Sequence, residues 1–173
     1  MVSLSRRGKP NNGFTLLETL VVISIIAFGA AIALPYMENM VSDYRLRSAS
    51  RVLVAHLNQM KLRAIRNNVR IAISIDATND TYTIFVDDNP ENWALDDDED
   101  VILGRDNGEN ASHRVTDLSE QGLEITSNLV SSMTGFNGRG MQDRAVGGTI
   151  TITAANNKTK RIIISSIGTI RVN

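Results

Sequence analysis

The sequence predicts an α+β fold in which one long amino-terminal helix packs on antiparallel β-strands. Three features of the 173-residue chain predict it. An apolar segment near the amino terminus has the length of a membrane span, a helical repeat of apolar residues follows it directly, and several later segments alternate with a period of two. At about 100–200 residues per domain, the chain has room for one globular domain with an appendage.

Composition narrows the class of protein. Hydrophobic residues make up 42% of the chain and charged residues 21%, with a formal net charge of -1. These values argue against disorder and against a strongly basic protein that coats nucleic acid. The chain has no cysteine, which excludes disulfides, thiolate catalysis and every cysteine-based metal site.

The charges are segregated along the chain. Residues 1–13 and 44–70 carry basic residues and no acid. Residues 76–124 hold fifteen acids against two bases, and from residue 125 onward Asp143 is the one acid among basic residues. This distribution produces surfaces of opposite sign, which affects association more than the fold.

The first helical segment is a candidate membrane span. Residues 14–34 contain Glu18 as their one charged residue and are long enough to cross the ~30 Å hydrocarbon core. The basic residues before them predict that residues 1–13 stay in the cytoplasm and that the rest is exported. A secretory signal peptide would have a shorter apolar stretch and a small-residue cleavage site, and here the helical pattern continues past the span.

Glu18 is unusual because a carboxylate in a membrane span costs a few kcal/mol or more. Two interpretations are open: a functional site, or a side chain near the end of the span that reaches the interface. Its position in the junction Gly13-Phe14-Thr15-Leu16-Leu17-Glu18, directly after a basic leader, favours the functional one.

Residues 9–18, KPNNGFTLLE, resemble the class III leader of type IV pilins and type II secretion pseudopilins. In that family a prepilin peptidase cuts after the glycine and methylates the new terminal amine. The resemblance implies cleavage between Gly13 and Phe14, N-methylation of Phe14, and roles in assembly for Glu18 and Pro35. Proline is found at the position of Pro35 in pilin-like helices.

The helical pattern continues to about Arg66, a helix of roughly 80 Å at 1.5 Å per residue, in which Pro35 should introduce a kink. Apolar residues recur at steps of three and four and share one face, opposite Arg47, Arg51 and Asn58. The set is Leu46, Ala49, Leu53, Leu57, Met60 and Ala64. The first half of the helix suits lipid or neighbouring helices, and the second half must pack on a sheet.

Period-two alternation predicts that sheet. Residues 69–86 contain two strand segments around a turn at 77–80 and indicate a hairpin. Near the carboxyl terminus, three further strands are expected at 149–153, 161–165 and 169–172, with weaker candidates at 123–125 and 129–133.

The acidic run at residues 96–100 has two interpretations. Asp96, Asp98 and Asp100 form a weak candidate calcium site, because clustered carboxylates suit hard cations. An EF-hand loop that begins at Asp96 would need glycine at its sixth position, where this chain has Val101. A solvated acidic loop is therefore the favoured interpretation, and no metal site is predicted.

The carboxyl-terminal region extends the resemblance. Residues 136–140 (FNGRG) and 161–172 resemble the GspH/FimT-type minor pseudopilins. Some members bind DNA during natural transformation through a Gly-Arg-x-Arg loop, and the corresponding residues 168–171 have Thr169 in place of the first arginine. The basic candidates for phosphate contacts are Lys158, Lys160, Arg161 and Arg171.

No catalytic motif is present. The two histidines, His56 and His113, fall on different predicted elements, and His56 is expected to pack beside the sheet. The chain is therefore predicted not to be an enzyme and to need no cofactor. The resemblance implies a minor pilin or pseudopilin of a type II secretion pseudopilus or type IV pilus. The alternative is a DNA-binding minor pilin of a DNA-uptake pilus.

The same resemblance implies an organisation and a location. Residues 1–13 are the leader, 14–41 the transmembrane and assembly helix, and 42–173 a periplasmic domain of a single-pass protein of the bacterial inner membrane. The implied partners are other pilin-like subunits, the prepilin peptidase and the inner-membrane assembly platform.

Overall fold

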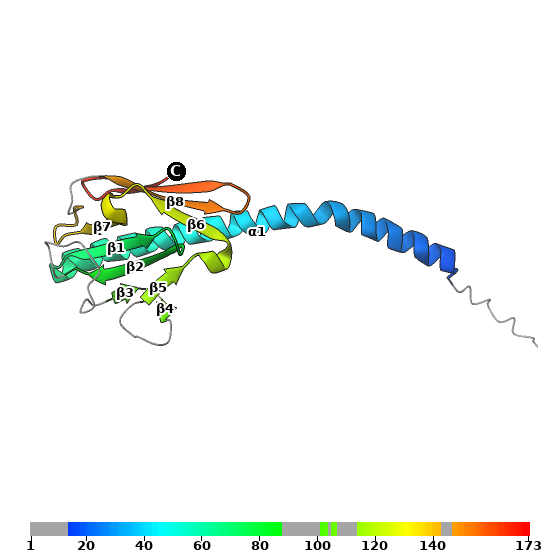
Figure 1. Cartoon of the computed structure of the whole chain (residues 1–173), viewed down its shortest axis with the longest axis horizontal. Helices are drawn as coiled ribbons and strands as arrows, with labels where there is room; N and C mark the ends of the chain where they lie inside the picture. The colour runs from blue at the N-terminus through cyan, green and yellow to red at the C-terminus, as the bar shows by residue number, and fades with distance from the viewer. Residues whose placement is uncertain (1–13, 88–100, 104, 107–113, 143–146) are drawn as a thin grey trace, which may run out of the picture. The chain divides into compact units, whose positions relative to one another are not determined.

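The computed structural model describes residues 14–87, 101–103, 105–106, 114–142 and 147–173 (Figure 1). The chain divides into two compact units with the boundary between Glu38 and Asn39. Gly13, His113 and the candidate calcium ligands Asp96, Asp98 and Asp100 lie outside the described residues.

Helix α1 (Leu16–Asn67) has the extent that the sequence predicts. It begins after Thr15, whose hydroxyl oxygen accepts the backbone N–H of Glu18 at 3.2 Å and so satisfies one of the free donors of the first turn. The part of α1 in the first unit is exposed and almost entirely apolar. By length and composition, this part can cross a membrane.

Among the described residues, six strands form a first antiparallel sheet, sheet A, in the order β4-β5-β2-β1-β7 with β3 also paired to β2. Its core is the predicted hairpin, in which Ile71 lies opposite Val86 and Asp76 opposite Thr81. The strands are β1 (Ile71–Asp76), β2 (Thr81–Val86), β3 (Val101–Leu103), β4 (Arg105–Asp106), β5 (Arg114–Asp117) and β7 (Met133–Phe136).

Four described strands form a second antiparallel sheet, sheet B, in the order β10-β9-β8-β6. The three predicted carboxyl-terminal strands are confirmed, and the weaker candidate at 123–125 is the start of β6. The strands are β6 (Leu123–Ser127), β8 (Gly148–Ala154), β9 (Thr159–Ile164) and β10 (Ile170–Val172).

The expected strand at 129–133 is mostly wrong. Residues Val130–Ser132 form a short 3₁₀ turn, η2, and only Met133 belongs to a strand, β7. Ser131 and Ser132 both have a φ of 55°, a left-handed conformation that does not occur within a regular strand. A further 3₁₀ turn, η1 (Ser119–Gln121), leads into β6.

Both sheets pack on the second-unit part of α1 and share one core with it (Figure 1). The six apolar residues of α1 that the sequence places on one face are all buried, and Leu53 and Leu57 are 0% exposed. Each fully buried leucine contributes roughly 1.5–3 kcal/mol to stability. The predicted amphipathic face is confirmed, and every residue of this core lies between Leu46 and Ile164.

Candidate functional site

The amino-terminal site consists of Phe14, Thr15 and Glu18 at the start of α1. Phe14 is 79% exposed, and Glu18 is exposed and is the one charged residue between residues 14 and 37. Glu18 occupies the third helical position after Thr15, so the pair has the Thr-x-x-Glu spacing of a capping box. This spacing is visible in the sequence, and it places Glu18 where a capping-box side chain reaches back to the backbone N–H of Thr15.

Pro35 lies within α1. The roles of Glu18 and Pro35 in assembly remain predictions, as do the kink at Pro35 and the processing at Gly13 and Phe14.

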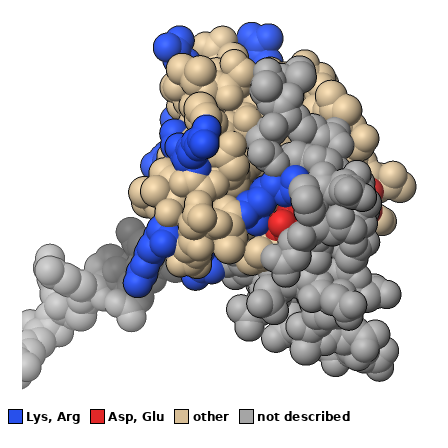
Figure 2. Space-filling view, turned by 90° about the vertical axis from the view of Figure 1, so that its left-hand side faces the viewer, with Lys and Arg blue, Asp and Glu red and all other residues tan. Residues whose placement is uncertain are grey.

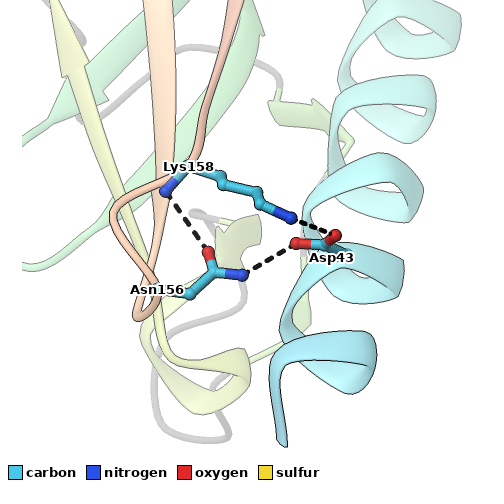
Figure 3. Close-up of polar contacts among 3 residues, drawn as sticks. All are labelled: Asp43, Asn156 and Lys158. Carbon is cyan, nitrogen blue, oxygen red and sulfur yellow. Dashed lines mark hydrogen bonds and ion pairs between the residues drawn. The ribbon is translucent and has the colours of Figure 1, made fainter. Parts of the chain in front are cut away.

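A second polar site joins α1 to the turn between β8 and β9 (Figure 3). The Asp43 carboxylate accepts hydrogen bonds from the Nδ2 of Asn156 at 2.7 Å and the ammonium group of Lys158 at 2.5 Å. The contact with Lys158, followed by that with Asn156, lowers the pKa of Asp43 below its usual value. Because Lys158 is 60% exposed, this pair adds little to stability. Its effect is to orient the turn on the helix.

The four basic residues that the sequence predicts as phosphate contacts lie at different places in the structure. Lys158 is bound to Asp43, and Lys160 lies on the inner face of sheet B, in a groove beside α1. Arg161 and Arg171 lie on the outer face, since Arg171 is opposite Ile163 and the residues between, Ile162 and Ile164, are buried. The four side chains therefore do not form one surface.

Basic residues are also spread over the end of the molecule seen in Figure 2, where little Asp or Glu is visible among the described residues. On α1, the ammonium group of Lys61 donates a hydrogen bond to the carbonyl oxygen of Gly168 at 2.9 Å. Arg70 pairs with the buried carboxylate of Asp87 at 2.6 Å. Lys61 thus connects α1 to the turn before β10, and Arg70 connects the start of β1 to the end of β2.

We expect DNA binding to be weak or absent at physiological salt, because only Arg161 and Arg171 of the four share a face and strong binding needs several phosphate contacts. A gel-shift titration of a fragment of residues 42–173 beside its Thr169→Arg variant checks this. Tight binding by the unchanged fragment that Arg171→Gln abolishes would contradict the prediction. Binding gained only by Thr169→Arg would support it.

His56 packs beside sheet A, as the sequence predicts. Its Nδ1 lies 2.9 Å from the hydroxyl oxygen of Tyr82, a side chain that is 1% exposed. Burial lowers the pKa of His56 below 6.5 and raises the pKa of Tyr82 to about 12. Both groups are therefore neutral at pH 7, and their hydrogen bond is structural.

His56 should make stability depend on pH. The unfolded chain protonates this histidine near pH 6.5 and the folded chain only at lower pH, so stability is expected to fall as pH drops from about 6.5 through the folded pKa. The lowered pKa values of Asp43 and Asp76 act separately, at pH below about 4. Urea unfolding of the 42–173 fragment should show this slope reduced in His56→Gln and kept in His113→Gln. An unchanged slope in His56→Gln would contradict the prediction.

No group of three potential metal-ligating side chains lies among the described residues. The candidate calcium ligands fall outside that part of the chain, so the calcium site stays a weak candidate.

Comparisons with known proteins agree with this architecture. The family "Type II transport protein GspH" matches residues 49–168, and the prokaryotic N-terminal methylation motif matches residues 8–34. A search of curated proteins finds no match to the sequence. The methylation motif covers the same junction that the leader resemblance identifies.

Two solved structures share the fold. The Pseudomonas aeruginosa type IV minor pilin FimU is 18% identical with a TM-score of 0.52, over 76% of this chain and 90% of that chain. The minor pseudopilin EpsH from the type 2 secretion system of Vibrio cholerae is 16% identical with a TM-score of 0.53, over 75% of this chain and 96% of that chain. At these identities, the likeness shows the fold alone.

Proposed function

This chain belongs to the GspH family of type II transport proteins and is a minor pseudopilin, a structural subunit and not an enzyme, and we propose that it joins its filament through a charged contact at its processed amino terminus. The observation that carries the proposal is Glu18. It is the one charge in an exposed apolar helix, and its carboxylate has no ion-pair partner among the described residues.

Cleavage after Gly13 would leave a charged amine on Phe14, four residues before Glu18 and on the same helical face. In apolar surroundings both charges are poorly solvated, and each is stabilised by a partner of opposite sign. Within one chain the carboxylate lies a full turn from the amine. In a filament, the Glu18 carboxylate of one subunit pairs with the Phe14 amine of its neighbour.

Processing and location follow the same proposal. The methylation motif and the exposed apolar helix are consistent with a pseudopilin anchored in the inner membrane. The basic leader of residues 1–13 favours a cytoplasmic amino terminus before cleavage, with residues 42–173 in the periplasm. The prepilin peptidase and the inner-membrane assembly platform are the proposed partners of the precursor and of the mature subunit.

The test separates pairing from helix capping. Glutamine can replace glutamate in a capping box but carries no charge, whereas valine can do neither. If pairing is the role of Glu18, both Glu18→Gln and Glu18→Val should lower the amount of chain in purified filaments by about tenfold or more, since each leaves the neighbour's amine unpaired. Processing, followed by mass spectrometry, should remain normal in both.

Glu38→Gln is the matched control, because it removes one charge from the same helix outside the apolar segment and should assemble normally. If Glu18→Gln assembles like the unchanged chain while Glu18→Val does not, capping is the role of Glu18 and the pairing proposal is wrong.

A further inference from the structure

We propose that the groove between α1 and the free edge of β10 binds an extended acidic segment of another pilin-like subunit, which adds a strand to sheet B. This inference rests on the proposed function and deepens it, since it states the chemistry of the partner. Three properties of the groove carry it: the backbone of β10, an apolar slot and a rim of cations.

The backbone of β10 offers free hydrogen-bonding groups. Among the described residues, β10 is an edge strand that pairs only with β9. Arg161 and Asn173 exchange both backbone hydrogen bonds, at 3.1 and 2.8 Å. Because such pairs alternate along antiparallel strands, the N–H and C=O groups of Ile170 and Val172 point away from the sheet. A further strand would pair with these groups.

An apolar slot lies next to this edge. The groove has a volume of about 300 Å³ and is lined by Arg47, Ser50, Arg51 and Val54 of α1, Lys160 of β9 and Val172 of β10. Val54 and Val172 supply its apolar walls, and Val172 is 47% exposed. The Ser50 hydroxyl already donates to the carbonyl oxygen of Leu46 at 2.6 Å. The slot therefore suits an aliphatic side chain of an incoming strand.

The rim of the groove is basic. Arg47, Arg51 and Lys160 line it, and none of the lining residues is acidic. Within the described part of the chain, no salt bridge joins these three side chains to a carboxylate. The acid nearest in the chain, Asp43, is bound by Lys158 and Asn156 (Figure 3), and it also attracts Arg47 without forming a salt bridge with it. Carboxylates beside the aliphatic residue of a partner strand would complement this charge and select the partner.

The combination favours a peptide over a nucleic acid. Phosphates could reach the cations, but a nucleic acid has neither main-chain amides to pair with Ile170 and Val172 nor an aliphatic side chain for the slot. An acidic β-strand matches the backbone edge, the slot and the rim together.

Lys160 and Arg161 provide a matched pair of variants. They are neighbours on β9 with the same charge, but Lys160 lies in the groove, whereas Arg161 is exposed on the outer face of sheet B. Lys160→Glu and Arg161→Glu change the net charge equally. A difference in peptide affinity between the two variants therefore comes from the groove and not from the net charge of the chain.

The experiment uses the full chain in detergent micelles and two blocked, fluorescently labelled pentapeptides, Asp-Val-Glu-Val-Asp and Lys-Val-Lys-Val-Lys. We expect the acidic peptide to bind about tenfold more tightly or better, and to slow hydrogen exchange at the amides of Ile170 and Val172. Lys160→Glu and Arg51→Glu should each weaken binding by about tenfold, while Arg161→Glu should leave it within about twofold.

Val172→Pro tests the backbone contact, because it removes an N–H that sheet B does not use and proline is tolerated at such edge positions. It should weaken binding of the acidic peptide. Equal binding of both peptides, equal losses in Lys160→Glu and Arg161→Glu, or displacement of the acidic peptide by a dT oligonucleotide would overturn the proposal. Because the assay needs no filament, such a result leaves the Glu18 test of the proposed function unaffected.

Discussion

Leu53→Asp is expected to unfold the second unit. Leu53 is 0% exposed and lies in the core that α1 shares with both sheets. The substitution removes a buried leucine and places a carboxylate in the core, which together cost several kcal/mol. Since small domains are stable by about 5–15 kcal/mol, most or all of that stability should be lost. Circular dichroism and urea unfolding of the 42–173 fragment measure it.

Val52→Asp is the matched control. Val52 precedes Leu53 on α1 but is 43% exposed, so its carboxylate stays in water and the fragment should unfold at close to the unchanged urea concentration. A Leu53→Asp fragment that folds with normal stability would show that α1 does not pack on the sheets through this residue.

Gly13→Arg should abolish maturation of the chain. By resemblance to class III leaders, the peptidase needs a small residue directly before the cut, where it approaches the backbone. We expect the variant to remain in the membrane as an intact precursor, while the unchanged chain begins with N-methylated Phe14. Mass spectrometry of the amino-terminal peptide distinguishes the two.

Gly8→Arg introduces the same side chain five residues earlier in the leader and should be processed normally. Normal processing of Gly13→Arg, or a mature chain that begins at a residue other than Phe14, would contradict the assignment of the cleavage site.

The elements that depend on local order of the residues follow from the sequence alone. The extent of α1, its buried face and the hairpin of β1 and β2 were predicted because their apolar residues recur at the period of the element that they form. The family was visible for the same reason, since the junction at Gly13 and Phe14 is one contiguous motif that the methylation match also covers.

The way in which the strands combine into sheets depends on the three-dimensional fold. Alternation identifies the buried face of a strand but not its neighbour, so the division into sheets A and B and the pairing of β7 with β1 were not predictable. The misassigned residues 129–133 show the same limit. Their apolar residues resemble a strand, but Ser131 and Ser132 adopt left-handed backbone conformations there.

The electrostatic sites also depended on the tertiary structure. Asp43 and Lys158 are 115 residues apart in the chain, yet they form an ion pair. Lys160 and Arg161 are adjacent, yet they lie on opposite faces of sheet B. Charges interact according to distance in space, and alternate residues of a strand face opposite ways. The sequence therefore showed which charges the chain carries, and the fold decided which of them act together.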